Sequence, residues 1–236
     1  MAGILAIVQA RVSSQRLPRK VLLPLNGRPS ICHVMDRVSM ATKVNEVVLA
    51  TSIMPSNDSL CDLAVKEDWE YVRGEEHDVV SRFATLIEQK QPDMVVRVCA
   101  DNFAIVPEVI DGAIERCINR NLDICNPFLR HTYPFGVGAE VATTDAFQRV
   151  ERETCNEPIQ YREHIFSWAY LNSDKFRVDS LPAPLDCTRP DVRVSVDTLE
   201  DLERVETIYS QVIGQEKYFD VQDIINIWDR LDLGAT

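Results

Sequence analysis

The strongest constraint on the fold of this chain is a repeated alternation of short apolar runs with longer helical patterns. The short runs, rich in β-branched residues, predict strands at 4–8, 46–50, 70–72 and 94–99, and a weaker one at 123–125. The segments between them predict helices at 29–42, 57–67, 78–89 and 107–119. Because the predicted strands show little polar alternation, we expect a mostly parallel sheet covered by helices on both faces. The pattern indicates a doubly wound α/β fold.

The second half of the chain breaks this alternation. Residues 126–160 are rich in Pro, Gly and aromatic residues, which predicts a loop or hairpin beside a ligand site. Beyond it we expect, in order, a helix at 158–172, strands at 176–181 and 192–196, and a helix that begins near residue 197. No linker or internal repeat divides the chain. We therefore predict one domain over 1–236 with three parts, at 1–125, 126–180 and 181–236.

The composition excludes several classes of protein. The chain has 236 residues, 45% of them hydrophobic, and a formal net charge of −12. An acidic surface argues against a nucleic-acid partner and against an anionic membrane. Seven scattered cysteines without a C-x-x-C pair favour a reducing compartment. Since no stretch is typical of a signal peptide or a membrane span, we expect a cytoplasmic protein.

One loop departs from this acidic average. Residues 9–20, QARVSSQRLPRK, hold Arg11, Arg16, Arg19 and Lys20 and no acid. The loop follows the first predicted strand, whose carboxyl end is where open α/β sheets bind ligands. Arg and Lys gathered there predict a site for several close negative charges, such as a triphosphate. The loop lacks the glycines of a Walker A motif or a dinucleotide-binding fingerprint.

Two acids also follow predicted strands. Asp101 comes after the run at 94–99, and Asp197 comes after the run at 192–196. If these strands are neighbours, the two carboxylates converge, and such a pair can hold Mg²⁺ together with phosphate oxygens. Each acid also has a structural alternative. Asp197 could be a helix N-terminal acid beside the capping pair Thr198 and Asp201, and Asp101 could belong to an Asp-Asn turn.

The segment 7–38, IVQARVSSQRLPRKVLLPLNGRPSICHVMDRV, resembles the signature of the acylneuraminate and octulosonate cytidylyltransferase family, and is closest to its spore-coat-polysaccharide branch. Further motifs follow in family order: VVLATS (47–52), RGEEHDVVSRF (73–83), VVRVCADN (95–102), YREHI (161–165) and VDTLEDL (196–202). The resemblance implies a Rossmann-like, glycosyltransferase-A-type α/β fold and a homodimer formed partly around 126–170. The chain departs from the family at Arg19, where Gly is common, and at Phe103 and Leu199, where Pro is common.

The resemblance also implies roles for individual residues. It makes Arg11, Lys20, Asp101 and Asp197 catalytic, and gives both aspartates to Mg²⁺. It implies that CTP contacts Gln9, Ala10, Arg11, Ser14, Arg16, Lys20, Thr51, Ser52, Gly74, Asp78, Arg82 and Ala100. It implies that a small anionic acceptor contacts Gly136, Glu140, Arg162 and His164. Residues 1–125 would then be the nucleotide-binding half, 126–180 the acceptor and dimerisation region, and 181–236 a C-terminal strand and helices. The other histidines, His33, His77 and His131, show no ligand spacing and are predicted to be structural.

The predicted function is that of a magnesium-dependent cytidylyltransferase. It would transfer CMP from CTP to an acidic, 3-deoxy-2-keto, sialic-acid-like sugar for polysaccharide biosynthesis and release pyrophosphate. An acceptor oxygen attacks the α-phosphorus in line, so the protein must supply positioning and charge neutralisation rather than a nucleophile. The alternatives are a nucleotidyltransferase for a phosphorylated or phosphonate acceptor, a glycosyltransferase, which the missing D-x-D motif disfavours, and a non-catalytic nucleotide-binding protein.

Overall fold

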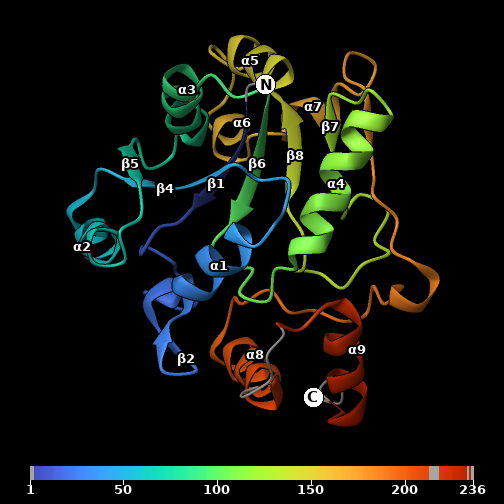
Figure 1. Ribbon diagram of the computed structural model, residues 1–236. Helices are drawn as coiled ribbons and strands as arrows, with labels where there is room; N and C mark the ends of the chain where they lie inside the picture. The colour runs from blue at the N-terminus through green and yellow to red at the C-terminus, as the bar shows by residue number, and fades with distance from the viewer. Residues whose placement is uncertain (1–2, 213–217, 233, 235–236) are drawn as a thin grey trace.

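A seven-stranded sheet forms the centre of the molecule (Figure 1). The structure is a computed structural model that describes residues 3–212, 218–232 and 234. The strands, in the spatial order β5–β4–β1–β6–β8–β7–β9, are β5 (Tyr71–Gly74), β4 (Glu46–Ser52), β1 (Ile4–Gln9), β6 (Met94–Cys99), β8 (Glu140–Thr143), β7 (Ile124–Cys125) and β9 (Val178–Asp179). The first four are parallel, and β8 is antiparallel to both of its neighbours. The predicted mostly parallel α/β fold is confirmed.

Helices cover both faces of this sheet (Figure 1). One face packs against α1 (Ser30–Ser39), α2 (Asp58–Lys66) and α4 (Pro107–Asn119). The core on this side continues past the strands to α8 (Leu199–Val212) and α9 (Val221–Arg230), which lie below the sheet in Figure 1. The other face packs against α3 (Val79–Lys90), α5 (Thr144–Glu153) and α7 (Ser167–Leu171), with the short α6 (Gln160–Glu163) beside α3. Strand β1 serves both layers, because Ala6 and Val8 enter one core and Leu5 and Ile7 the other. That two-sided burial explains the missing polar alternation.

Two predicted elements take a different form. The helix expected at 158–172 is broken into α6 and α7, because His164 leaves the helical region with φ −105° and ψ 77°. The break lets the consecutive side chains of Ile165 and Phe166 both enter the core. The strand expected at 192–196 is also wrong: apart from one isolated parallel bridge between Phe135 and Arg193, the segment pairs with no strand in the described chain. Its period-two pattern reflects burial of alternate valines.

Other elements were missed or are shorter than expected. The region 126–160, expected to be a loop or hairpin, contains β8 and α5. The strand expected at 176–181 is reduced to β9. The helices expected in 181–236 are α8 and α9, although the prediction gave no bounds for α9. It overlooked a small hairpin of β2 (Pro24–Leu25) and β3 (Arg28–Pro29). Pro107 begins α4 as expected, whereas Pro29 lies one residue before α1, at its N-cap.

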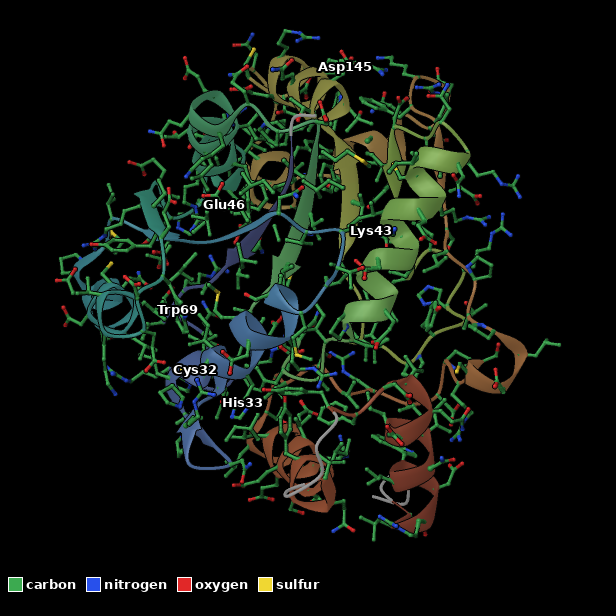
Figure 2. The ribbon with its side chains drawn as sticks, viewed as in Figure 1. Cys32, His33, Lys43, Glu46, Trp69 and Asp145 are labelled. Atoms are coloured by element: carbon green, nitrogen blue, oxygen red, sulfur yellow. The ribbon has the colours of Figure 1, made fainter. Side chains whose placement is uncertain are left out.

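His33, on α1, is structural, as predicted (Figure 2). Its Nε2 lies 2.7 Å from the carbonyl oxygen of Leu25. Its ring packs edge-on against Tyr209 of α8, with 4.7 Å between the ring centroids. Burial lowers the pKa of His33, which keeps the imidazole neutral at physiological pH. The residue therefore joins α1 to the C-terminal helices.

The seven cysteines form no disulfide. Cys32, Cys61, Cys117 and Cys125 are buried, Cys99 and Cys187 are partly buried, and Cys155 is exposed, each as a free thiol. This agrees with the expectation that the cysteines are not a covalent framework. Within the described residues, no helix has both the length and the apolar character needed to cross a membrane.

Arg19 has a backbone conformation that favours glycine. Its φ of 58° and ψ of 22° are left-handed, immediately before the 3-10 helix η1 (Lys20–Leu22). We expect Arg19→Gly to raise the free energy of unfolding by roughly 0.5–1 kcal/mol, since a Cβ is disfavoured in this conformation. Urea unfolding measures the change. Arg19→Ala, which keeps the Cβ, should bring no gain, and a loss of stability in Arg19→Gly would show that the side chain itself stabilises the loop.

Candidate active site

A cavity of about 910 Å³ lies at the carboxyl ends of β1 and β6. This is the edge of a parallel sheet at which ligands bind in open α/β folds. The predicted site residues that line it are Gln9, Ala10, Arg11, Ser14, Arg16, Lys20, Arg82, Ala100, Asp101, His164 and Asp197. The predicted residues outside its lining are Thr51, Ser52, Gly74, Asp78, Gly136, Glu140 and Arg162. The structure thus brings the cationic loop and both aspartates into one cavity.

Lys20 joins the two aspartates. Its Nζ lies 2.7 Å from Oδ2 of Asp101, 3.1 Å from Oδ1 of Asp197 and 2.8 Å from the carbonyl oxygen of Val196. The backbone N–H of Val196 donates to the carbonyl of Asp101 at 3.0 Å, which ties the two segments together. The carboxylates therefore converge as predicted, although the segment before Asp197 is not a strand of the sheet.

The structural alternatives for these aspartates do not account for their side chains. Thr198 and Asp201 form the capping box of α8 through hydrogen bonds of 3.2 and 2.9 Å between each side chain and the other's backbone N–H. Asp197 contributes only its backbone N–H, which donates to Asp201 at 2.9 Å. This leaves the carboxylate of Asp197 free to bind Lys20. Asp101 does lie in a turn, residues 99–102, but this turn is closed by the backbone N–H of Asn102, which donates to the carbonyl of Cys99 at 3.1 Å, and the carboxylate of Asp101 binds Lys20 instead.

The two carboxylates fit a divalent cation that also binds a ligand. They already share one cationic atom, Nζ of Lys20. Across the described ranges, no cluster of three or more His, Cys, Asp or Glu side chains could hold a metal by protein ligands alone. Mg²⁺ is commonly bound by one or two carboxylates, with phosphate oxygens and waters completing the shell. The donor set therefore suits a metal that arrives with a polyphosphate.

The opposite wall of the cavity pairs cations with acids. Arg11 Nη1 lies 3.0 Å from Oε1 of Glu163. The Glu76 carboxylate accepts hydrogen bonds from the hydroxyls of Ser13 and Ser52. Burial opposes the ionisation of Glu76, but these hydrogen bonds and the nearby Arg11 outweigh it and hold the pKa of its carboxyl below the usual range. Ser52 therefore acts on the cavity through Glu76 rather than by lining it.

Arg82 is a buried cation without enough partners. It is 3% exposed, and neither Nε nor Nη1 has a hydrogen-bond partner among the described residues. Burial lowers its pKa to about 10, so it stays charged at neutral pH. Gly74 makes the room for it, because a Cβ at Gly74 would lie 2.4 Å from Cγ of Arg82. Since buried donors are nearly always satisfied, a ligand with acceptor atoms is expected to complete this site.

Thr51, the neighbour of Ser52 on β4, is fully buried, and within the described chain its Oγ1 finds no hydrogen-bond partner. It lies outside the cavity lining. The structure therefore gives it no direct contact with the cavity, and nothing in the structure explains why a hydroxyl rather than a methyl group stands there.

Glu140 is occupied by its protein partners. It lies directly opposite Arg97 in the pairing of β6 with β8, and its carboxylate binds Arg97, the hydroxyl of Tyr170 and, at 3.1 Å, Nδ2 of Asn126. Burial, and then the Glu140 charge, raise the pKa of Tyr170, so its hydroxyl remains a donor. Arg97 lines the cavity and Glu140 does not. The carboxylate of Glu140 is therefore engaged by three protein donors, and Arg97 rather than Glu140 faces the cavity.

Gly136 has a packing role. Its φ is 107°, and a Cβ there would lie 2.6 Å from the backbone nitrogen of Ser195. The close approach lets Phe135 exchange two backbone hydrogen bonds of 2.8 Å with Val192 and Val194. Gly136 therefore does not line the cavity, but it holds the segment that leads to Asp197 against the region after residue 126.

Arg162 is taken up by an ion pair. Its Nε lies 2.9 Å from Oδ2 of Asp78, and both side chains are mostly buried. The other oxygen of Asp78 caps α3 by accepting from the backbone N–H of Ser81 at 2.8 Å. The pair thus joins α6 to α3 instead of facing a ligand. The expected roles of Arg162 in acceptor binding and of Asp78 in nucleotide binding are replaced by a role in holding the cavity wall.

We expect Arg162→Gln to lower the free energy of unfolding by about 2 kcal/mol, because it leaves the half-buried Asp78 carboxylate without its cation. A double-mutant cycle with Asp78→Asn, followed by urea unfolding, should give a coupling energy of about 1–2 kcal/mol. An unchanged stability together with a raised KM for the acceptor would contradict this assignment and restore the role in acceptor binding.

Several lining residues were not predicted from the sequence: Gln15, Val21, Glu76, His77, Val79, Arg97, Cys99 and Glu163. His77 corrects an expectation, because it was predicted to be structural and instead faces the cavity, with Nδ1 4.0 Å from Oε2 of Glu163. Arg97 had a signal in the sequence, as the one cation inside the apolar strand MVVRVC. Glu76 and Glu163 had none beyond their place in the motifs.

A cationic loop and two convergent carboxylates at the carboxyl end of an open α/β sheet are the parts that a nucleotidyl-transferring enzyme needs. The family model described as Cytidylyltransferase matches residues 5–229. The chain belongs to the cytidylyltransferase family, which confirms the resemblance of its motifs.

Three similar proteins match this chain over nearly all of their own length. It is 30% identical to the spore coat polysaccharide biosynthesis protein SpsF of Bacillus subtilis (strain 168), across 100% of this chain and 98% of that relative. A solved cytidylyltransferase from Leptospira borgpetersenii serovar Hardjo-bovis (strain JB197) has a TM-score of 0.87 at 22% identity, covering 98% of this chain and 94% of that one. A CMP:2-keto-3-deoxy-manno-octonic acid synthetase complexed with CTP has a TM-score of 0.64 at 18% identity, covering 90% and 100%. At these identities the solved structures show a shared fold.

Proposed function

We propose that this chain transfers CMP from CTP to an acidic sugar of the 3-deoxy-2-keto class and releases pyrophosphate, in the biosynthesis of a surface polysaccharide. The observation that carries the proposal is the meeting of Asp101, Asp197 and Lys20 in the cavity of a cytidylyltransferase-family chain. Two likenesses support the substrates: one relative is named for polysaccharide biosynthesis, and one structural neighbour is a synthetase of a CMP-activated keto-deoxy sugar acid complexed with CTP.

The proposed mechanism assigns each part of the cavity a task. Asp101 and Asp197 would hold Mg²⁺, which when bound neutralises phosphate charge. Arg11, Arg16 and Lys20 would bind the triphosphate oxygens and stabilise the charge that develops on the leaving pyrophosphate. Both Arg side chains are now held by acids, Glu163 and Asp197, and would exchange them for phosphate. The protein provides no nucleophile, because the acceptor hydroxyl attacks the α-phosphorus directly.

Arg82 would read the base. Cytosine presents two neighbouring acceptors, O2 and N3, to a guanidinium, whereas uracil presents a donor at N3. We expect kcat/KM for CTP to be at least about 100-fold higher than for UTP. A site that hydrogen-bonds one base discriminates against another base that would leave its buried polar groups unpaired. Arg82→Met should lower the ratio of kcat/KM for CTP to kcat/KM for UTP by about tenfold or more. Pyrophosphate release measures the rates and calorimetry the affinities. Arg28→Met, which removes an Arg paired with Asp36 away from the cavity, is the control. Equal use of CTP and UTP by the unmodified chain would contradict the proposal.

The function itself is tested by a screen of acceptors with CTP and Mg²⁺, read by pyrophosphate release and product mass. Acidic 3-deoxy-2-keto sugars should give a product heavier by one CMP. Transfer only to phosphorylated or phosphonate compounds would establish the alternative acceptor class. No transfer to any acceptor, with CTP still bound, would support a nucleotide-binding protein without catalysis.

The proposal also covers the cellular compartment of the enzyme, the division of its chain and its oligomeric state. We place it in the cytoplasm, in keeping with its seven free cysteines. We retain the division into a nucleotide-binding half, an acceptor and dimerisation region at 126–180 and a C-terminal part, within a homodimer formed partly around 126–170. Light scattering at increasing protein concentration would test the dimer.

A further inference from the structure

Asp197 binds more cations than one carboxylate needs. Arg16 Nη2 lies 2.8 Å and Lys20 Nζ 3.1 Å from Oδ1, while Arg193 Nη2 lies 2.8 Å from Oδ2. Lys20 is buried and is shared with Asp101, whereas the side chains of Arg16 and Arg193 are 68% and 48% exposed. The two arginines are therefore the cations that can leave Asp197 at the lower cost, because solvent can replace their contacts.

Arg193 reaches Asp197 from a different part of the chain than Arg16. It belongs to the segment before α8, and its backbone is bridged to Phe135. Its guanidinium lies 4.9 Å from the centroid of the Phe135 ring, which is itself 39% exposed. This contact holds the Arg193 side chain against the segment that contains Phe135. Arg16, in contrast, lies in the loop after β1, with Arg11 and Lys20.

Occupation of the site must redistribute these cations. A divalent ion held by Asp101 and Asp197 would repel the cations in contact with the same carboxylates, most strongly where water is excluded. Arg16 would then turn to the triphosphate that its own loop binds. Arg193 binds the other oxygen of the same carboxylate, and beside it lies the partly exposed ring of Phe135. A released guanidinium next to an exposed ring is suited to an anionic ligand with a carbon skeleton.

We propose that Arg193 binds the carboxylate of the acceptor after it leaves Asp197, and that Phe135 packs against the acceptor's carbon skeleton. The inference rests on the proposed function and deepens it, since it gives the acceptor subsite a cation. Arg193 and Phe135 are themselves outside the cavity lining, but Arg193 contacts Asp197, which lines the cavity. Two other arginines have no such contact with a lining residue: Arg162 pairs with Asp78, and Arg130 pairs with Asp179 at 3.0 Å. Arg97 is neutralised by Glu140.

The proposal is tested by measuring how tightly proteins with substitutions at Arg193 bind one acidic sugar. The probe is 3-deoxy-manno-octulosonate, titrated by calorimetry into protein that holds Mg²⁺ and the non-transferable α,β-methylene analogue of CTP. Arg193→Gln should weaken its binding about 10- to 100-fold, the loss typical of one charge-assisted contact. The amide of the same acid, which lacks the negative charge, should bind the unmodified chain and Arg193→Gln with the same affinity. Arg193→Lys should recover part of the affinity, and Arg130→Gln, the matched control, should change nothing.

Two further measurements separate this role from one in positioning Asp197. Two affinities should not weaken by more than about threefold in Arg193→Gln: that of the free protein for Mn²⁺, followed by electron paramagnetic resonance, and that for the CTP analogue. Neither ligand needs the released side chain, and Mn²⁺ no longer competes with it for Asp197. Phe135→Leu keeps Arg193 and should weaken the binding of the acid and of its amide equally.

Some outcomes would overturn the inference. These are equal acid binding by Arg193→Gln and the unmodified chain, no saturable acid binding by the unmodified chain, or a loss confined to Mn²⁺ or to the CTP analogue. If the acceptor screen still shows transfer of CMP, the proposed function stands and only the subsite is wrong. If the screen shows no transfer, the proposed function has failed independently.

Discussion

Asp101→Asn and Asp197→Asn are each expected to lower kcat at saturating CTP by about 1,000-fold or more. The two carboxylates meet at one point, so each would supply one of the two protein ligands of the metal. Loss of an anionic ligand removes part of the several kcal/mol that a metal contributes to the transition state, and a 1,000-fold change corresponds to about 4 kcal/mol. Pyrophosphate release against Mg²⁺ concentration would measure both the rate and the metal requirement.

Asp201→Asn provides the matched control for these variants. Asp201 is four residues from Asp197 on the same segment, but its carboxylate caps α8. Its replacement should cost about 1 kcal/mol of stability and leave the metal dependence unchanged. If Asp197→Asn behaved like Asp201→Asn, with normal kcat and a lower melting temperature, Asp197 would be a structural acid and the metal site would have to be sought elsewhere.

Lys20→Met is expected to lower kcat/KM for CTP by about 100- to 1,000-fold. The variant removes a cation from the phosphate-binding loop and also leaves Asp101 and Asp197 facing each other without the charge between them. The first effect weakens triphosphate binding and the second disturbs the metal site, so the loss should exceed the roughly 1.5–3 kcal/mol of one charge-assisted hydrogen bond. Steady-state kinetics with varied CTP would measure it.

Two comparisons make the Lys20 result specific. Lys43→Met removes a partly exposed lysine that is paired with Glu115 and should leave the kinetics unchanged. Lys20→Arg keeps the charge and should retain more activity than Lys20→Met, although the larger guanidinium does not fit the same three acceptors. Full activity of Lys20→Met at low and high CTP would show that the phosphate site does not include this loop.

The departures from the family pattern have local explanations. Leu199 is the first residue of α8, a position at which proline is also well tolerated because its missing N–H would have no helical partner. Phe103 is fully buried, and its carbonyl accepts a hydrogen bond of 2.7 Å from Tyr209 of α8. The phenyl ring therefore adds to the core that anchors the C-terminal helices, and neither change touches the cavity.

The sequence by itself determined the parallel half of the fold and the composition of the cationic loop. Strands β1, β4, β5 and β6 and the helices between them follow from local periodicity, because a buried parallel strand requires an apolar run wherever it lies in the chain. Such reasoning could not find β8 or α5, which lie in a region whose Pro, Gly and aromatic residues are typical of loops. Their formation depends on pairing of β8 with β6, more than forty residues earlier in the chain.

The tertiary structure decided which side chains face the cavity. Arg82, Arg97, Arg162 and Arg193 look alike in the sequence, yet one is buried without enough partners, one is neutralised across β6 and β8, one holds α6 to α3, and one rests on Asp197. The choice depends on which acid lies within about 3 Å, and that distance is set by contacts between segments far apart in sequence. The sequence therefore predicted that these cationic side chains would bind anions. Only the packing of distant segments decided which acid pairs with which arginine, and which arginine is left without an acid.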